Sequence, residues 1–170
     1  MYKYPKTVKL YFFIIFIFDK SVQIIFYYVD MKINLIENKT VQKSVLNGTE
    51  VAHLESENRP WGSFYNLADG NYKMKVIKVN PGEQLSVQSH TKRSEKWICL
   101  SGILTVNLGE TLESLTEYHL VPNQTIDIPR GYIHQAKNNT NTEVYFFELQ
   151  TGTYFGEDDI IRYSDVYGRQ

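Results

Sequence analysis

Short strand-like runs separated by closely spaced turn signals are the feature that most constrains the fold of this chain. Apolar and polar residues alternate around positions 72–76, 104–108 and 126–128, which is typical of strands with one buried face. Residues 144–149 are nearly all apolar, which indicates a strand buried on both faces. Turn-forming pairs, including Pro81-Gly82 and Arg130-Gly131, divide these runs. Because no long amphipathic pattern intervenes, the sequence predicts an antiparallel sandwich or barrel.

Composition narrows the class of protein and of partner. The 170 residues suffice for one ordinary domain, and a 42% hydrophobic, 22% charged chain is globular. Eighteen basic and nineteen acidic residues give a net charge of -1, so the chain has no global positive field and we expect no nucleic-acid partner. Cys99 is the only cysteine, which excludes a disulfide within the chain and fits a reducing compartment. We therefore expect a cytoplasmic protein.

Three segments differ in character: residues 1–30 form an apolar N-terminal extension, residues 31–58 a polar arm with one strand, and residues 59–170 the main domain. The extension has three open interpretations: translated sequence upstream of a soluble start at Met31, a signal or membrane anchor, or a genuine strand of the barrel or of a swapped dimer. The first is favoured. The apolar run of residues 10–18 is too short to span a bilayer, and Asp19-Lys20 interrupts it, so we do not expect a membrane partner.

Two segments carry residues that suit a divalent metal ion. Gln88 and His90 are two residues apart and would share one face of a strand, and Glu95 follows past a short bend. His134 lies in the second segment, beside a tight turn. Imidazole, carboxylate and amide groups that converge would suit a divalent ion. Spacing alone leaves open the alternative that these are structural or surface residues.

Both segments resemble the paired motifs of the cupin superfamily. The first motif fits at Gly82, His90, Glu95 and Gly102, with Gln88 in place of its first histidine. The second motif fits at Pro129, Gly131, His134 and Asn138, with Asn123 in place of its leading glycine. The resemblance implies an all-β fold, the double-stranded β-helix (jelly-roll) cupin barrel. It also implies one divalent metal ion, Zn, Mn, Co or similar, held by Gln88, His90, Glu95 and His134.

Further blocks within residues 58–169 resemble the C-terminal domain of type II phosphomannose isomerases. They are Arg59-Pro60-Trp61-Gly62-Ser63, residues 79–88, Trp97 with Ser101-Gly102, Ile128-Pro129-Arg130-Gly131, and the closing blocks at residues 156–162 and 165–169. The resemblance implies a metal-dependent isomerase that interconverts mannose 6-phosphate and fructose 6-phosphate, and a homodimer. No segment resembles a nucleotidyltransferase domain, so guanylyl transfer is not expected of these residues.

Residue roles follow from the same resemblance. Arg93 occupies the family's arginine beside the metal motif, which implies a catalytic role in stabilising the enediolate or gripping phosphate; its alternative is a solvated loop charge. Lys92, Lys96, Arg130 and Tyr132 are candidate substrate-binding residues, and each has a surface or packing role as its alternative. His53 and His119 are expected at the surface.

Lysines 92 and 96 stand where the family has histidines. This departure keeps two other functions open: a non-catalytic sugar-phosphate-binding or regulatory cupin, and another cupin sugar-modifying enzyme.

Overall fold

The computed structural model describes residues 12–18, 21–27, 42–46 and 48–169. The chain divides into two compact units, residues 1–39 and 40–170, and each is described by itself. In the first unit, β1 (Phe12–Phe18) pairs antiparallel with β2 (Ser21–Tyr27). The three interpretations of the N-terminal extension rest on residues that lie outside the described part of the chain. These residues are Lys3, Lys6, Lys9, Asp19, Lys20 and Met31.

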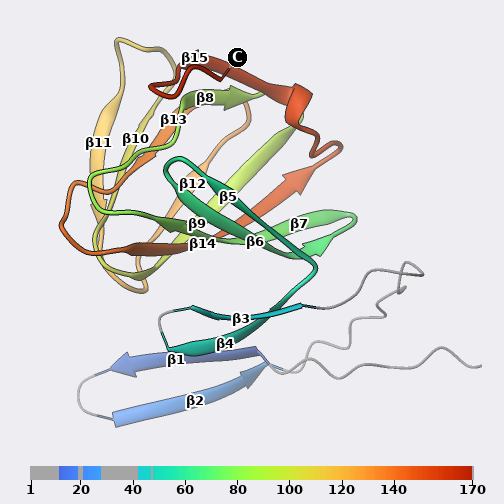
Figure 1. Cartoon of the computed structure of the whole chain (residues 1–170), viewed down its shortest axis with the longest axis vertical. Helices are drawn as coiled ribbons and strands as arrows, with labels where there is room; N and C mark the ends of the chain where they lie inside the picture. The colour runs from blue at the N-terminus through green and yellow to red at the C-terminus, as the bar shows by residue number, and fades with distance from the viewer. Residues whose placement is uncertain (1–11, 19–20, 28–41, 47, 170) are drawn as a thin grey trace, which may run out of the picture. The chain divides into compact units, whose positions relative to one another are not determined.

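The described part of the second unit is built from strands and one short 3₁₀ turn (Figure 1). The strands are β3 Gln42–Leu46, β4 Thr49–His53, β5 Glu55–Arg59, β6 Gly62–Asp69, β7 Tyr72–Val79, β8 Val87–His90, β9 Arg93–Ser101, β10 Leu104–Gly109, β11 Thr116–Leu120, β12 Thr125–Ile128, β13 Ile133–Lys137, β14 Val144–Gly152 and β15 Ile160–Ser164. The 3₁₀ turn, η1, covers Glu157–Asp159. The predicted all-β class is therefore confirmed.

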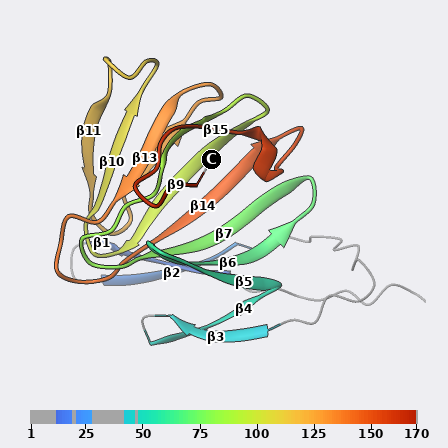
Figure 2. The same cartoon turned by 45° about the horizontal axis from the view of Figure 1, so that its top comes forward.

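Two antiparallel sheets form the barrel, as Figure 2 shows. The five-stranded sheet has the order β11-β10-β13-β8-β15, and the six-stranded sheet has the order β12-β9-β14-β7-β6-β5. Neighbours in each sheet are mostly far apart in sequence, so the chain passes repeatedly from one sheet to the other. This alternation is the jelly-roll arrangement. A separate hairpin is made by β3 and β4.

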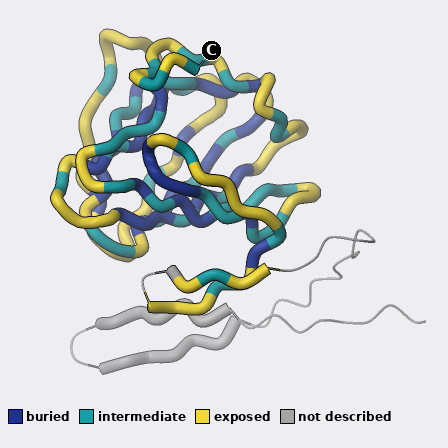
Figure 3. The backbone as a smooth tube through the Cα atoms, in the orientation of Figure 1, coloured by how far each residue is buried: buried dark blue, intermediate teal, exposed yellow. Residues whose placement is uncertain are grey.

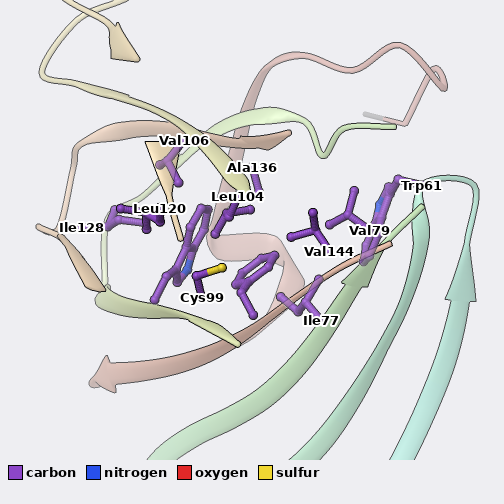
Figure 4. Packing of buried hydrophobic residues seen from close by; sticks show 12 residues of the cluster. Trp61, Ile77, Val79, Cys99, Leu104, Val106, Leu120, Ile128, Ala136 and Val144 are labelled. Atoms are coloured by element: carbon purple, nitrogen blue, oxygen red, sulfur yellow. The ribbon is translucent and has the colours of Figure 1, made fainter. Parts of the chain in front are cut away.

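The hydrophobic core lies between the two sheets. Strands of both sheets contribute its buried side chains, including Val144 from the larger sheet and Leu104 and Ala136 from the smaller one (Figure 4). Figure 3 shows the buried positions concentrated on the strands, with exposed residues at the turns between them. The rings of Trp97 and Phe146 lie 4.9 Å apart between centroids, so these two aromatic side chains pack at the centre of the core.

The strands and turns that the sequence predicts are found in the structure. The alternating runs form β7, β10 and β12, and residues 144–149 lie in β14, between β9 and β7. Asn123 has a φ of 73°, so it adopts the left-handed conformation expected where the cupin motif has glycine. Gly131 has a φ of 88° in the turn before β13.

The segment of residues 31–58 contains more structure than its sequence pattern predicts. Its described part holds β3, β4 and most of β5, rather than one strand. The strand β5 is the edge of the six-stranded sheet, and it reads Glu-Ser-Glu-Asn-Arg, without apolar alternation. A polar edge strand of this kind carries no periodic signal, which explains why the pattern missed it. Among the described residues, no helix has the length and apolar character needed to cross a membrane.

Replacing Phe146 with alanine is expected to lower the free energy of unfolding by about 3–5 kcal/mol. The ring of Phe146 is fully buried, so its removal leaves a cavity beside Trp97. Chemical denaturation of the metal-free protein measures the change. Val166→Ala is the control, since Val166 is 65% exposed and should change stability little. A Phe146 variant as stable as the control would contradict the packing described for the core.

Candidate metal centre

Three buried side chains converge between the sheets. His90, Glu95 and His134 each offer one ligand atom, and these atoms all lie within 4.8 Å of one another. His90 Nε2 lies 3.1 Å from Glu95 Oε1, and His134 Nε2 lies 3.7 Å from Glu95 Oε2. The two imidazole rings are 5.0 Å apart between centroids. The group could hold a metal ion, because both histidines and a carboxylate present donor atoms to one point.

Strand register explains how residues far apart in sequence meet here. In the smaller sheet, Gln88 on β8 pairs with His134 on β13 and with Arg162 on β15, so the three form one row across the sheet. His90 lies on the same face as Gln88, two residues along β8. In the larger sheet, Glu95 on β9 pairs with Gln150 on β14.

The turn between β8 and β9 sets the relative position of His90 and Glu95. Asp159 in η1 is buried and caps this turn by accepting hydrogen bonds from Thr91 N, Thr91 Oγ1 and Lys92 N at 3.1, 2.7 and 3.3 Å. Burial would raise the pKa of Asp159, but these hydrogen bonds and the charge of Arg93 hold it below its usual value. The closing Gly-Glu-Asp-Asp block therefore braces the short bend that the sequence predicted between the candidate ligands.

Glu95 is a buried carboxylate, and each of its two oxygens accepts a hydrogen bond. Its Oε2 accepts a hydrogen bond of 2.9 Å from Trp97 Nε1, and its Oε1 accepts one of 3.0 Å from Gln150 Nε2. Burial by itself would raise the pKa of Glu95. The imidazoles of His90 and His134, together with Arg93, outweigh this effect and hold the pKa well below its usual range. The carboxylate is consequently an anion at neutral pH.

Ring nitrogens of His90 and His134 are available to bind a metal ion. His134 Nδ1 lies 3.0 Å from the carbonyl oxygen of Tyr132, and a proton donated there leaves Nε2 as the lone-pair nitrogen. Burial lowers the pKa of His134 to about 4, so its ring is neutral at physiological pH. His134 Nε2 and both ring nitrogens of His90 are buried without hydrogen-bond partners. An orphaned buried nitrogen is costly, and a coordinated cation would satisfy His134 Nε2 and one of the two ring nitrogens of His90.

Gln88 and Arg93 also reach the cleft above this group. Gln88 is half-buried, and its Oε1 accepts a hydrogen bond of 2.9 Å from Ser86 Oγ. Arg93 is buried, and its Nε lies 3.5 Å from Glu95 Oε1 while its NH1 group donates to Gly156 O at 3.0 Å. Both residues line the cleft together with Glu95. The structure thus brings the proposed catalytic arginine and all four proposed ligands to one region.

The proposed substrate-binding residues lie elsewhere. Lys96 is on the outward face of β9, because neighbouring strand residues point to opposite faces, and it pairs with Asp127. Lys92 is exposed, with its Nζ 4.6 Å from the centre of the Tyr154 ring. The lining of the cleft includes neither lysine.

Arg130 and Tyr132 are also outside the cleft. Arg130 is exposed in the turn before β13, and the Tyr132 hydroxyl donates to Glu110 Oε1 at 2.7 Å. The structure therefore does not bring Lys92, Lys96, Arg130 and the Tyr132 hydroxyl to the His–Glu–His group.

Sequence reasoning missed other residues that line the cleft. Among them are Arg59, Lys75, Glu148, Gln150, Arg162 and Arg169. A signal existed for two of these, because Glu148 and Gln150 are polar residues two apart in an otherwise apolar strand. The expectation for His53 was wrong, since its ring is buried against Tyr65 and its Nε2 lies 2.8 Å from Ser44 Oγ. His119 is exposed, as expected.

Comparison with known proteins shows the family of this chain. The family model described as mannose-6-phosphate isomerase C-terminal matches residues 47–165, which is more than half of the chain. The chain belongs to this family. Xanthan biosynthesis protein XanB of Xanthomonas campestris is 43% identical to this chain over 112 residues, and mannose-1-phosphate guanylyltransferase ManC of Salmonella typhimurium is 36% identical over 133 residues.

The two alignments cover 65% and 77% of this chain but 23% and 27% of the relatives, so the chain spans about a quarter of their length. Among solved structures, the capsular polysaccharide assembling protein CapF of Staphylococcus aureus matches with a TM-score of 0.56 and 19% identity, covering 64% of this chain and 33% of that one. This likeness shows the fold, and the cupin barrel expected of an isomerase C-terminal domain is confirmed.

The metal-free protein is expected to lose stability as the pH falls from about 6.5 to 4. Folding lowers the pKa of His134 from 6.5 to about 4, so in this window the unfolded chain binds a proton that the folded chain does not. Above this window His134 does not lower the free energy of unfolding. Within the window, the slope of the free energy of unfolding against pH approaches about 1.4 kcal/mol per pH unit for one proton. Urea unfolding in the presence of a chelator, repeated across this range, measures it.

His134→Gln is expected to flatten this slope, whereas the exposed His119→Gln variant should retain it. Equal slopes in the wild type and the His134 variant would show that His134 is not the buried neutral group described.

Proposed function

We propose that this domain is a metal-dependent aldose–ketose isomerase that interconverts mannose 6-phosphate and fructose 6-phosphate. The observation that carries the proposal is a buried His–Glu–His group at a cleft lined by more basic than acidic side chains. Five cationic side chains line the cleft, Arg59, Lys75, Arg93, Arg162 and Arg169, against three carboxylates, Glu95, Glu148 and Glu157. Several guanidinium groups beside a metal-ligand group suit a small anionic sugar.

The ligands of the ion would be His90, Glu95 and His134, with Gln88 as a neutral fourth ligand from the same row as His134. Their donor atoms suit zinc, manganese or cobalt. A bound divalent ion supplies a Lewis acid that polarises the sugar carbonyl. The protein's own contribution is to hold the His134 ring neutral and Glu95 as an anion, since each must be in that form to coordinate.

The phosphate group would bind to the arginines nearest solvent. The side chains of Arg59, Arg162 and Arg169 are 29%, 17% and 23% exposed, whereas Arg93 and Glu95 are almost completely buried. A guanidinium binds phosphate oxygens bidentately, and a partly exposed position gives the ligand access. This assignment replaces Lys92, Lys96 and Arg130 with residues that line the cleft.

Arg93 would act closer to the reacting carbons. Its guanidinium is held by Gly156 O and lies 3.9 Å from Asp159 Oδ2, so the side chain is fixed in position before substrate arrives. Its Nε is buried without a hydrogen-bond partner. A fixed cation beside the cleft would stabilise negative charge that develops on the sugar oxygens.

The lysines at positions 92 and 96 are the reason to consider a non-catalytic sugar-phosphate-binding or regulatory cupin. Neither lines the cleft, and Lys96 points away from the barrel interior. Exchanging histidine for lysine at these two positions leaves the candidate metal ligands and Arg93 unchanged. The placement therefore favours the isomerase over the non-catalytic alternative.

Purified protein loaded with a divalent metal is expected to exchange the C2 proton of mannose 6-phosphate with deuterium and to form fructose 6-phosphate. Proton NMR in D₂O follows both signals. Glu95→Ala should abolish the exchange, and Glu117→Ala, which alters an exposed glutamate on β11, should preserve it. Binding of mannose 6-phosphate without exchange, with zinc, manganese and cobalt each tested, would refute the isomerase and favour the binding protein.

A further inference from the structure

The cleft contains a second buried carboxylate, Glu148, to which the proposed function assigns no task. It lies on β14, is 4% exposed and lines the cleft together with Glu95 and Arg93. Alternation along β14 places Phe146, Glu148 and Gln150 on the inward face. Phe146 belongs to the core, so the inward face of this strand changes from apolar to polar where the cleft begins.

Gln150 links Glu148 to the candidate metal ligand. Its Nε2 donates to Glu148 Oε1 at 2.8 Å and to Glu95 Oε1 at 3.0 Å. Because one amide nitrogen bonds to both, these two carboxylate oxygens lie within about 6 Å of each other. This spacing would allow one side chain to bind the metal while the other reaches an adjacent carbon of a sugar held at that metal.

Lys75 forms an ion pair with the same oxygen of Glu148. It is the cross-strand partner of Glu148 on β7, and its Nζ lies 3.5 Å from Glu148 Oε1. Lys75 Nζ also lies 5.1 Å from the centre of the Phe64 ring. The hydrogen bond from Gln150 and the ion pair with Lys75 both hold Glu148 Oε1 as an acceptor.

The surroundings also make this carboxylate a better base than an exposed glutamate. Burial, followed by the negative charge of Glu95, raises the pKa of Glu148, and Lys75 only partly offsets the increase. General bases work best when their pKa is near the working pH. The positive charge of Arg93 also lowers the pKa of Glu148, so it offsets a further part of the increase.

We propose that Glu148 is the base that moves the proton between C2 and C1 of the hexose phosphate, an inference that rests on the proposed function. The Glu148 carboxylate removes the proton from C2. The electrons of that C–H bond form the C1=C2 double bond, and the carbonyl pair moves to O1. The O2 proton is then transferred to O1 as the C2 carbonyl forms, and Glu148 returns its proton to C1. Atoms and charge balance without any further reactant.

The test compares Glu148→Gln with Glu117→Gln, which makes the same change at an exposed carboxylate outside the cleft. Three properties are measured for each: metal ions per chain, the Kd of mannose 6-phosphate by calorimetry, and the rate of C2 proton exchange. The base assignment predicts that Glu148→Gln lowers the exchange rate at least about 100-fold. Metal content should be unchanged and Kd should stay within about threefold, because the amide keeps the shape of the side chain.

Glu148→Gln leaves Lys75 without its anionic partner, which can destabilise a buried pair. The double variant Lys75→Met/Glu148→Gln removes both charges and carries the same prediction for the exchange rate if the single variant does not fold.

The outcomes separate the two proposals. Wild-type exchange that persists in the Glu148 variants overturns the base assignment alone. Loss of metal or of hexose-phosphate binding along with exchange also overturns it, because Glu148 would then be a structural residue. Wild-type protein that binds metal and sugar but shows no exchange overturns the isomerase itself, and the assignment of a base with it.

Discussion

Burial of the Glu95 carboxylate is the constraint on which the site depends. A carboxylate removed from water is unstable unless donors or cations surround it, and here Trp97, Gln150, two imidazoles and Arg93 do so. These groups come from β8, β9, β13 and β14, so a jelly-roll that closes two sheets around one interior is required to gather them. The imidazoles keep unpartnered nitrogens in that interior, which makes a bound cation the natural completion of the group.

The fold and the site meet at two places. On β9 and β14, Trp97 and Phe146 form the core, and Glu95 and Gln150 continue the same inward faces into the cleft. At the chain's C-terminal block, Asp159 caps the turn that joins β8 to β9. A block without an evident packing role in the sequence thus fixes the spacing of the ligands.

Much of the fold could be predicted from sequence because period-two alternation and turn residues are local signals. Spacing alone places Gln88 and His90 on one face of a strand, but the full set of candidate ligands, with Glu95 and His134, came from the resemblance to the paired cupin motifs. The polar edge strand β5 gave no such signal. The same alternation places Lys96 opposite Glu95, whereas the cleft position of Arg162 follows from the pairing of β15 with β8. Such non-local registers depend on how the whole barrel closes and cannot be read from neighbouring residues.

The most direct test of the metal centre is the metal content of the protein after dialysis against a divalent ion, measured by mass spectrometry of the metal. One tightly held ion per chain is expected in the wild type and in Glu117→Ala. Loss of that ion is expected in Glu95→Ala and in His134→Ala, since each removes a ligand from the only such group found among the described residues. A folded Glu95→Ala protein that still held one ion per chain would contradict the proposed metal centre.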